Sequence, residues 1–461
     1  MKRVYIPKPG KKERRPLGIP TVLDRGKQAL AKLALEPQLE AYMEPNSFGF
    51  RPARKAMDAT WRIRHKFKYG AMYVYDADVE KCFDRISHEA LLTKLQVAHP
   101  ILQRQIQAWL EAGIFENGRP FPSSGSGTPQ GGVISPLLAN WALDGMQAAI
   151  YEAVYTHVGN QKQANQVLYI RYADDFVILS PQIEWLQAAI AAAKRHLERV
   201  GLNINEGKTR VIHTVDRAVD GPQGRRIFDF LGFTFSQRRV SRHKRLSLGG
   251  KKPRTTQLVP AVLPTKAQVK RHMEELREAM TTCTSSLALI RKLNPIIRGW
   301  RNYYKFSDAR TYTRLPSDLD MRLYRLIRHW IRPRFNKYGR PTDCWTSQKG
   351  YNWVFYARDP ATGKLVYLER SATVSWSLKS YNRIDASRSP YDGDLSYWSQ
   401  HANSSYFQGV LGGNERQAYL LKKHQGKCAS CKQGFHASEF AYAQVDHIRP
   451  KSQGGSQAWT N

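Results

Sequence analysis

The chain of 461 residues has few cysteines and no long apolar run. Its five cysteines are scattered, apart from Cys428 and Cys431, which excludes a disulfide framework and is typical of a reducing compartment. No apolar run reaches transmembrane length, and no secretory signal or amphipathic anchor is visible at the start. We therefore expect no membrane partner and a cytoplasmic protein, of bacterial type or organellar, associated with the nucleoid.

Acidic residues are also scarce, with 38 Asp and Glu against 72 Lys and Arg, a formal net charge of +34. An excess of this size implies a polyanionic partner, and nucleic acid is the first candidate. Hydrophobic residues make up 41% of the chain, which is enough to form real cores. The length suggests two to four domains.

Two adjacent carboxylates, Asp174 and Asp175, stand between two β-rich apolar runs in the stretch 169–179, which reads YIRYADDFVIL. The runs predict two strands, and the Asp pair predicts the tight turn between them. Two buried carboxylates are too costly without a partner, and hard divalent cations such as Mg²⁺ take oxygen ligands. The alternative is an exposed turn with no function.

A third carboxylate, Asp78, follows another β run that begins at Met72. Phosphoryl transfer by two metal ions needs carboxylates from separate segments that converge on the ions. An Asp at the end of a strand is common, so Asp78 alone carries little weight. From about 72 to 235 strands alternate with helices around this acidic site, which predicts an α+β fold rather than a regular parallel array.

Two loops near this region suit a ligand with phosphates. The glycine-rich loop 127–132 runs into an apolar helix, and glycines permit close approach of the backbone, but no Walker lysine follows. The basic turn 8–15 joins two extended runs and predicts a basic hairpin. An ordinary loop and a solvated charged loop are the respective alternatives.

From about residue 265 we expect three helices, the second and third with an apolar stripe and arginines off that stripe. Charges of one sign on successive helices would repel one another without a polyanion, so contact with RNA or a duplex is favoured over a solvated face. The arginines expected to contact RNA are Arg291, Arg298, Arg301, Arg322, Arg325 and Arg328. Residues 340–425 mix aromatic with basic side chains, which suits nucleic acid or a small irregular β-rich domain.

Five segments, in this order, resemble the ordered blocks of the reverse transcriptase encoded by group II introns, also called a maturase. They are Leu-Gly-Ile-Pro at 17–20, Ser-Phe-Gly-Phe-Arg-Pro at 47–52, the strand carrying Asp78, Gly-Thr-Pro-Gln-Gly-Gly at 127–132, and Tyr-Ala-Asp-Asp at 172–175. Any one block is a weak signal, but five in sequence are highly specific. The match covers nearly the whole chain.

The resemblance implies an α+β right-hand polymerase followed by an all-α thumb and further modules. The implied divisions are fingers and palm at 1–240, a basic linker at 241–264, the thumb or maturase domain X at 265–340, a DNA-binding connector at 341–425, and a partial zinc-supported HNH endonuclease module at 426–461.

The resemblance also implies roles for single residues. Asp78, Asp174 and Asp175 would hold two Mg²⁺ ions that serve the primer 3′-hydroxyl and the triphosphate. Phe83 would exclude a ribose 2′-hydroxyl, or would be a core aromatic, or both, and Gln130 would contact the incoming nucleotide. Lys8 and Arg15 would grip its triphosphate.

In the tail, the sequence resembles an HNH endonuclease module. The resemblance implies that Asp446 would bind the nuclease metal, that His447 would activate water, and that Cys428 and Cys431 would bind a possible Zn²⁺. The second cysteine pair and the last metal ligand of that pattern are missing, and so is the family's usual segment before the first strand. We therefore expect an incompetent nuclease and a longer natural chain cut at both ends.

The implied function is an RNA-directed DNA polymerase that also assists splicing of a group II intron and copies it during target-primed retrotransposition. Its partners would be the intron RNA, target DNA with a primer strand, and deoxynucleoside triphosphates. The alternatives are an RNA-binding splicing cofactor without polymerase activity, a reverse transcriptase of retron or CRISPR-associated type, and a viral RNA polymerase.

Overall fold

The computed structural model describes residues 1–7, 14–116, 119–121, 125–128, 130–220, 224, 226–239, 258–333, 344–348, 350–378, 381–401, 414–443, 445 and 451–453. The chain forms two compact units, each of which brings together segments that are far apart in the sequence. Unit 1 comprises residues 1–63, 71–224 and 382–461, and unit 2 comprises residues 64–70 and 225–381. No described helix combines the length and the apolar character that a membrane span requires.

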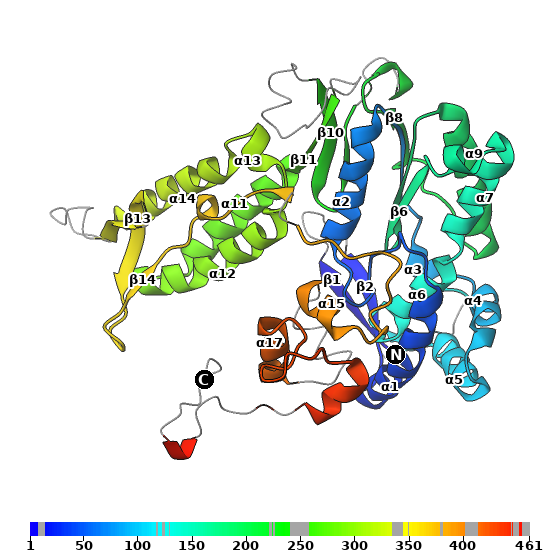
Figure 1. Cartoon of the computed structure of the whole chain (residues 1–461), viewed down its shortest axis with the longest axis horizontal. Coiled ribbons are helices and arrows are strands. Elements are labelled where there is room, and N and C mark those ends of the chain that lie inside the picture. The colour runs from blue at the N-terminus through cyan, green and yellow to red at the C-terminus, as the bar shows by residue number, and fades with distance from the viewer. Residues whose placement is uncertain are drawn as a thin grey trace. The chain divides into compact units, whose positions relative to one another are not determined.

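The centre of unit 1 is an antiparallel four-stranded sheet with the strand order β6-β7-β3-β8. Its strands are β3 (Tyr73–Ala77), β6 (Leu168–Tyr172), β7 (Asp175–Ser180) and β8 (Arg210–His213). The five residues after Asp175 in β7 are all buried, because α9 (Ile183–Arg199) packs on β3 and β7 and in turn contacts α7 (Met146–Val158) (Figure 1). The predicted α+β architecture is present here.

A second sheet of unit 1 contains the predicted basic hairpin. Strands β1 (Lys2–Pro7) and β2 (Arg14–Ile19) pair antiparallel from Lys2 opposite Ile19 to Pro7 opposite Arg14. Strands β4 (Ile114–Glu116) and β5 (Arg119–Phe121) complete the order β2-β1-β4-β5. The tip of the hairpin, which includes Lys8, lies outside the described residues.

Helices pack with the central sheet in one large apolar core. The helix α1 begins where the Thr21 hydroxyl accepts a hydrogen bond from the Asp24 backbone N–H, which satisfies an otherwise unpaired donor. Besides α7 and α9, the α-helices described before residue 224 are α1 (Val22–Tyr42), α2 (Ala56–Lys66), α3 (Cys82–Arg85), α4 (His88–Lys94), α5 (Pro100–Glu111), α6 (Ser135–Leu143) and α8 (Gln161–Ala164).

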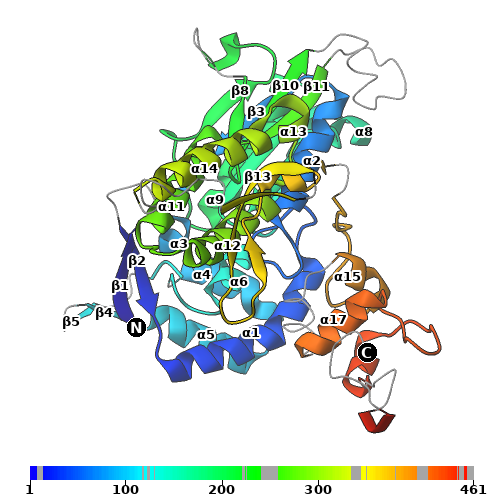
Figure 2. The ribbon, with the colours of Figure 1, turned by 90° about the vertical axis from the view of Figure 1, so that its left-hand side faces the viewer.

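Unit 2 contains the three predicted helices, which lie side by side around an apolar core (Figure 2). They are α11 (Lys266–Thr281), α12 (Ser286–Tyr304) and α14 (Leu315–Ile331), and the short α13 (Ala309–Tyr312) joins the last two. Pro295 lies inside α12, and the helix continues through it. Two three-stranded sheets flank the helices: β9 (Phe228–Phe230), β10 (Phe233–Arg239) and β11 (Leu258–Pro264), and β12 (Trp345–Gln348), β13 (Tyr351–Arg358) and β14 (Leu365–Tyr367).

The chain returns to unit 1 after residue 381, and the segment 382–401 packs against the start of α2. The Asp58 carboxylate accepts hydrogen bonds from the backbone N–H of Lys55 at 2.8 Å and of Ile384 at 3.2 Å. The buried Arg54 guanidinium donates to two carbonyl oxygens of the segment, at 3.1 and 2.9 Å. These contacts attach the segment to the rest of unit 1 through its backbone.

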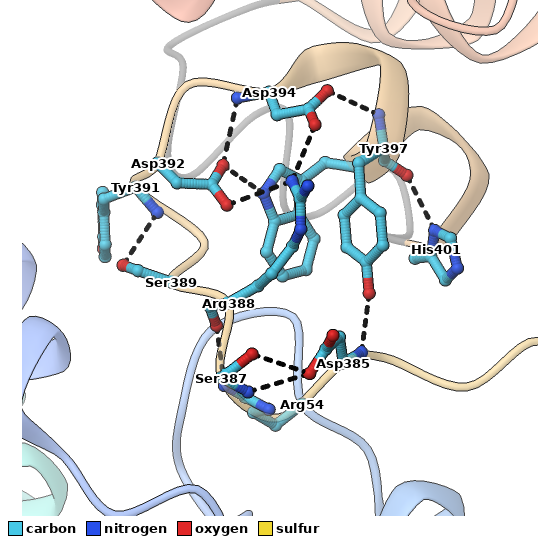
Figure 3. A network of polar contacts seen from close by, with 11 residues as sticks. Arg54, Asp385, Ser387, Arg388, Ser389, Tyr391, Asp392, Asp394, Tyr397 and His401 are labelled. Carbon is cyan, nitrogen blue, oxygen red and sulfur yellow. Dashed lines mark hydrogen bonds and ion pairs between the residues drawn. The ribbon is translucent and has the colours of Figure 1, made fainter.

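The same segment is stiffened by its own side chains (Figure 3). Arg388 pairs with Asp394 at 2.6 Å, and the Tyr397 hydroxyl accepts a hydrogen bond from the Asp385 backbone N–H at 2.6 Å. The stretch 341–425, which was expected to form one connector, is therefore divided. Its first part packs as β12–β14 on the helices of unit 2, and the rest packs on unit 1, with α15 (Leu395–His401) and α17 (Glu415–Lys423).

Candidate active site

The two acids of the stretch 169–179 stand at the tip of the β6–β7 hairpin. The strands pair from Leu168 opposite Leu179 to Tyr172 opposite Asp175. Ala173 takes a left-handed backbone with φ 58°, which closes the turn tightly. Because β3 pairs with β7 up to Ala77, Asp78 leaves β3 beside the acidic tip. The predicted hairpin and the predicted neighbouring acid are both present.

The three carboxylates lie within electrostatic reach of one another. Burial raises the pKa of Asp175 to about 6, and the charges of Asp174 and Asp78 contribute to this rise. Burial also raises the pKa of Asp174, Asp78 raises it further, and the positive charges of Arg15 and Arg171 oppose the change. Oxygen donors that repel one another in a partly buried place are suited to a hard divalent cation.

The carboxylates do not close into a preformed metal cage. Within the described ranges, no three His, Cys, Asp or Glu side chains are gathered as a metal site. Instead, the Lys208 ammonium donates to an Asp78 carboxylate oxygen at 3.0 Å, and its charge lowers the pKa of Asp175. The donor set fits Mg²⁺ in chemistry and charge, and Lys208 neutralises part of it in this structure.

A completely buried arginine, Arg171, holds the acidic turn in place through hydrogen bonds. The Arg171 guanidinium donates to the Asn140 side-chain oxygen at 2.9 Å and to the Ala173 carbonyl at 3.3 Å. The Asn140 amide donates in turn to the Gly49 carbonyl at 2.7 Å. This chain of contacts ties the hairpin to α6 and to the loop 47–52.

The loop 47–52 lies directly on the hairpin. The backbone N–H of Phe48 donates to the Arg171 carbonyl, and the N–H of Arg171 donates to the Asn46 carbonyl, both at 2.9 Å. A Cβ at Gly49 would lie 2.3 Å from the Ala173 nitrogen, so a larger residue would displace the turn. The sequence analysis identified the loop as a block but missed Arg171, Asn140 and Lys208 as parts of the site. Arg171 was visible only as a charged residue inside an apolar run.

The residues expected to contact the nucleotide lie near this site to different degrees. Arg15, on β2, is close enough to lower the pKa of Asp174. Phe83, on α3, is half-buried on the core and makes an edge contact with Phe50 at 6.1 Å between ring centroids. The Gln130 carbonyl accepts a hydrogen bond from the Gly18 backbone N–H at 2.7 Å, which joins the glycine-rich loop to β2.

The six arginines that were predicted to contact RNA fall into two groups. On α12, Arg291 pairs with Asp359 at 2.8 Å, and both Arg298 and Arg301 pair with Glu369. The α14 arginines are Arg322, Arg325 and Arg328; all three are exposed, and in the part of the chain that the structure describes none has a carboxylate at ion-pair distance.

A groove of about 930 Å³ within unit 2 is bounded by α11, α14 and β10–β11. Six cations line it against two acids, Glu274 and Asp318, so that its field is positive. The cations are Arg238, Lys266, Lys270, Arg277, Arg322 and Arg325.

The cysteine pair near the C-terminus forms a tight turn. Backbone N–H groups of Cys431 and Ser430 lower the pKa of the Cys428 thiol, which favours a thiolate. The described residues supply no third ligand beside this pair, so the structure gives no support to the expected zinc. Asp446 and His447 lie outside the described residues, and the nuclease module stays a prediction.

Comparison with known proteins finds two families in succession along the chain. Residues 6–235 match the family "Reverse transcriptase (RNA-dependent DNA polymerase)" and residues 269–347 match "Group II intron, maturase-specific domain". The first match contains Asp78, Asp174 and Asp175, and the second contains all six predicted RNA-binding arginines.

Among characterised proteins, the group II intron-encoded protein LtrA of Lactococcus lactis subsp. cremoris is 27% identical over 376 residues, which are 66% of this chain and 60% of the relative. The protein YkfC of Escherichia coli (strain K12) is 29% identical over 247 residues, 47% of this chain and 64% of the relative. The chain thus spans about 60% of the length of LtrA. The solved structure of apo telomerase from Candida tropicalis has a TM-score of 0.42 at 14% identity, over 72% of this chain and 56% of that one, a likeness too low to carry an argument.

Proposed function

This chain belongs to the reverse transcriptases encoded by group II introns, and we propose from this that it is an RNA-directed DNA polymerase and a maturase that assists the splicing of its intron. The observation that carries the proposal is the acidic hairpin with Asp78 at its side, inside the reverse transcriptase match. The maturase-specific match follows in the same chain and contains α12 and α14.

The polymerase site would hold Mg²⁺ through Asp78, Asp174 and Asp175. Bound there, Mg²⁺ supplies Lewis-acid stabilisation of the transferring phosphate and activation of the primer hydroxyl. The chain's own groups supply position and charge. Arg171 and Asn140 fix the turn that carries the two adjacent acids.

We propose that β2, α3 and the glycine-rich loop supply the contacts to the incoming nucleotide. Arg15 adds positive charge on the triphosphate side, Gln130 meets the nucleotide from the glycine-rich loop, and Phe83 limits the space at the sugar. Gly131 has φ 121°, and a Cβ there would lie 2.9 Å from the Gly18 carbonyl, so only glycine lets this loop approach β2 so closely.

The maturase activity is assigned to unit 2. The positive groove between α11 and α14 and the exposed arginines of α14 match the phosphates of a folded RNA. The partners proposed for the whole cycle are the intron RNA, a primer strand in target DNA, and deoxynucleoside triphosphates. The proposed location of the protein is the cytoplasm. The copying step would extend a nicked DNA strand along the intron RNA during retrohoming.

The test is primer extension on an RNA template with Mg²⁺, run in parallel with RNA binding. Asp174→Asn should lower the extension rate by roughly a thousandfold or more, because metal stabilisation of the reacting phosphate is worth several kcal/mol. RNA affinity should stay near that of the unchanged protein, because the arginines of unit 2 are untouched. The matched control is Asp24→Asn, a partly exposed acid at the start of α1 that lies outside the acidic site, which should extend normally.

Extension by Asp174→Asn at the unchanged rate would refute the metal assignment. An unchanged protein that binds intron RNA but extends no primer would leave the splicing cofactor without polymerase activity as the function.

A further inference from the structure

Unit 2 contains a cavity of about 300 Å³ on the opposite flank of α14 from the positive groove. It is bounded by α14 on one side and by β12 and β13 on the other. Three aromatic side chains, Tyr324, Trp345 and Trp353, form its walls. The volume lies at the lower end of the range for small-ligand sites.

The floor of this cavity is rigid and apolar. Phe355, Leu323 and Ile327 line it and are buried members of the unit 2 core. The wall rings hold one another in place, with Tyr324 edge-on to Trp345 at 4.8 Å and near Trp353 at 6.3 Å between centroids. Aromatic surfaces that are fixed before binding lose little entropy when a flat ligand enters.

Trp353 is the most unusual of these residues. It is 57% exposed, although a ring of this size contributes much more to stability when buried. Its backbone is left-handed, with φ 59°, at an irregularity in the β12–β13 pairing between Thr346 and Gln348. A bulky residue in this conformation is a genuine outlier, and β-bulges commonly redirect a side chain toward a functional site.

The charges around the cavity favour an anionic polymer. Both acids in the lining already have cationic partners: Asp320 pairs with Arg370 at 3.4 Å and accepts hydrogen bonds from two backbone N–H groups, and Glu369 pairs with α12 arginines. The Arg328 guanidinium lies over the Tyr324 ring at 5.7 Å, which leaves its charge at the rim.

We propose that this cavity binds one unpaired nucleobase of a single-stranded segment of RNA or DNA, stacked on Trp353 and Tyr324, with Arg328 on the adjoining phosphate. The proposal rests on the nucleic-acid function proposed above and adds a site to it. Unstacked bases are commonly bound on aromatic side chains, and every base offers a flat face for this. The Asn352 amide lies in the lining; its oxygen accepts a hydrogen bond from the Ser347 hydroxyl at 2.9 Å, and its NH₂ group can donate to a base edge.

The experiment measures binding of labelled oligonucleotides of one length by fluorescence anisotropy, with the full chain. Three probes are used: oligoadenylate RNA, oligodeoxyadenylate DNA, and an abasic phosphodiester strand. The abasic strand carries the same charge but has no bases. The matched pair of variants is Trp353→Leu and Trp353→Phe, of which only the second keeps an aromatic face, and Tyr356→Leu, on the same strand outside the cavity, is the control.

Trp353→Leu should weaken binding of a base-containing strand by about fivefold or more, the effect of one lost aromatic stack. Its affinity for the abasic strand should not change, and Trp353→Phe should bind nearly normally. The RNA and DNA probes show which strand the cavity takes, because only the matching one responds.

Equal weakening of the base-containing and abasic strands would overturn the proposal, because it would show a general loss of folding or charge. Unchanged binding of all three strands by Trp353→Leu would overturn it as well. Primer extension on the same preparations is read separately. A polymerase that extends normally while Trp353→Leu shows no base-dependent loss refutes this site alone.

Discussion

The two units use their positive charge in opposite ways. In unit 1 two arginines that hold the loop and hairpin of the acidic site are buried: Arg171 is completely buried on Asn140, and Arg51 is buried in an ion pair with Glu40 at 2.6 Å, whereas Arg15 beside Asp174 is exposed. In unit 2 the arginines of α14 are exposed and unpaired within the described residues. The net charge of +34 therefore includes both buried arginines that hold the fold and exposed arginines that are available to a ligand.

The difference lies in what each cation can do. A buried guanidinium with fixed hydrogen bonds holds a backbone in place, and its removal leaves polar groups unsatisfied. An exposed guanidinium adds little to stability and remains available to a phosphate. Substitutions in each unit test whether the buried arginines act on stability and the exposed arginines on phosphate binding.

The largest expected difference is in stability. Arg171→Leu should lower the free energy of unfolding of unit 1 by about 3 kcal/mol, because Asn140 loses its partner and a buried charge network is opened. Arg322→Leu on α14 should change stability by about 0.5 kcal/mol or less. Thermal unfolding of both variants at neutral pH checks this pair.

The control for Arg171→Leu is Arg171→Lys, which keeps the charge but cannot reproduce the planar fork of donors. It should recover part of the stability and less of the primer extension, since the Ala173 turn depends on the fork. If Arg171→Leu and Arg322→Leu melt at the same temperature, the buried arginine has no structural role beyond that of a surface residue.

Two buried histidines extend the comparison to pH. Burial lowers the pKa of His196 in unit 1 to about 4, and the nearby charges of Lys94, Arg171 and Arg199 contribute to the lowering. Burial alone lowers the pKa of His272 in unit 2 to about 4, where its ring stacks on Trp300. Positive charge therefore acts on the histidine of unit 1 only.

Both pKa values are lower in the folded state than in the unfolded state. Each histidine therefore stabilises the protein above about pH 6.5, and this stability is lost as the pH falls from 6.5 toward 4. The loss at pH 4.5 should be about 2 kcal/mol for each. Buried Glu44, whose pKa burial raises to about 7, acts with the opposite sign, because its protonated form is favoured in the fold.

The measurement is the melting temperature between pH 7.5 and 4.5 for His196→Gln and His272→Gln, each compared with the unchanged protein. Each variant should show a smaller acid loss. Adding Arg171→Leu should raise the pKa of His196 and leave that of His272 where it is. If Arg171→Leu raised the pKa values of both histidines equally, the effect of the Arg171 charge would not be confined to His196.

Much of the fold could be predicted from local sequence, but the long-range side-chain contacts that support the acidic site could not. The hairpin around Asp174 and Asp175 follows from two β-rich runs and a turn, and the helices of unit 2 follow from their apolar stripes. Arg171 could not be assigned, because its partner Asn140 is 31 residues away and reaches it only through the packing of α6.

The division of 341–425 was missed for the same reason. Nothing in the local sequence of 382–401 shows that its backbone bonds to Asp58 and Arg54, more than 300 residues earlier. The pairing of the α12 arginines with Asp359 and Glu369 was equally hidden, since it arises where β13 and β14 pack on α12. A charged face on a helix predicts cations, but only the fold shows which of them are already neutralised.

The smallest expected effect separates two arginines within unit 2. Arg325 lines the positive groove without a carboxylate partner in the described chain, whereas Arg298 is paired with Glu369. Each phosphate contact contributes about 0.7–0.9 to the slope of log affinity against log salt. Arg325→Gln should lower the slope for a short labelled RNA duplex by about this amount, with a modest loss of affinity.

Arg298→Gln should change the same slope by much less, because Glu369 already offsets its charge and Arg301 remains to pair with that carboxylate. The two variants remove the same charge from neighbouring helices, so their difference measures the effect of the ion pair itself. Titrations from low to physiological salt give both slopes. If Arg298→Gln lowers the slope as much as Arg325→Gln, then Glu369 gives up Arg298 when RNA binds, and the α12 arginines contact RNA together with those of α14.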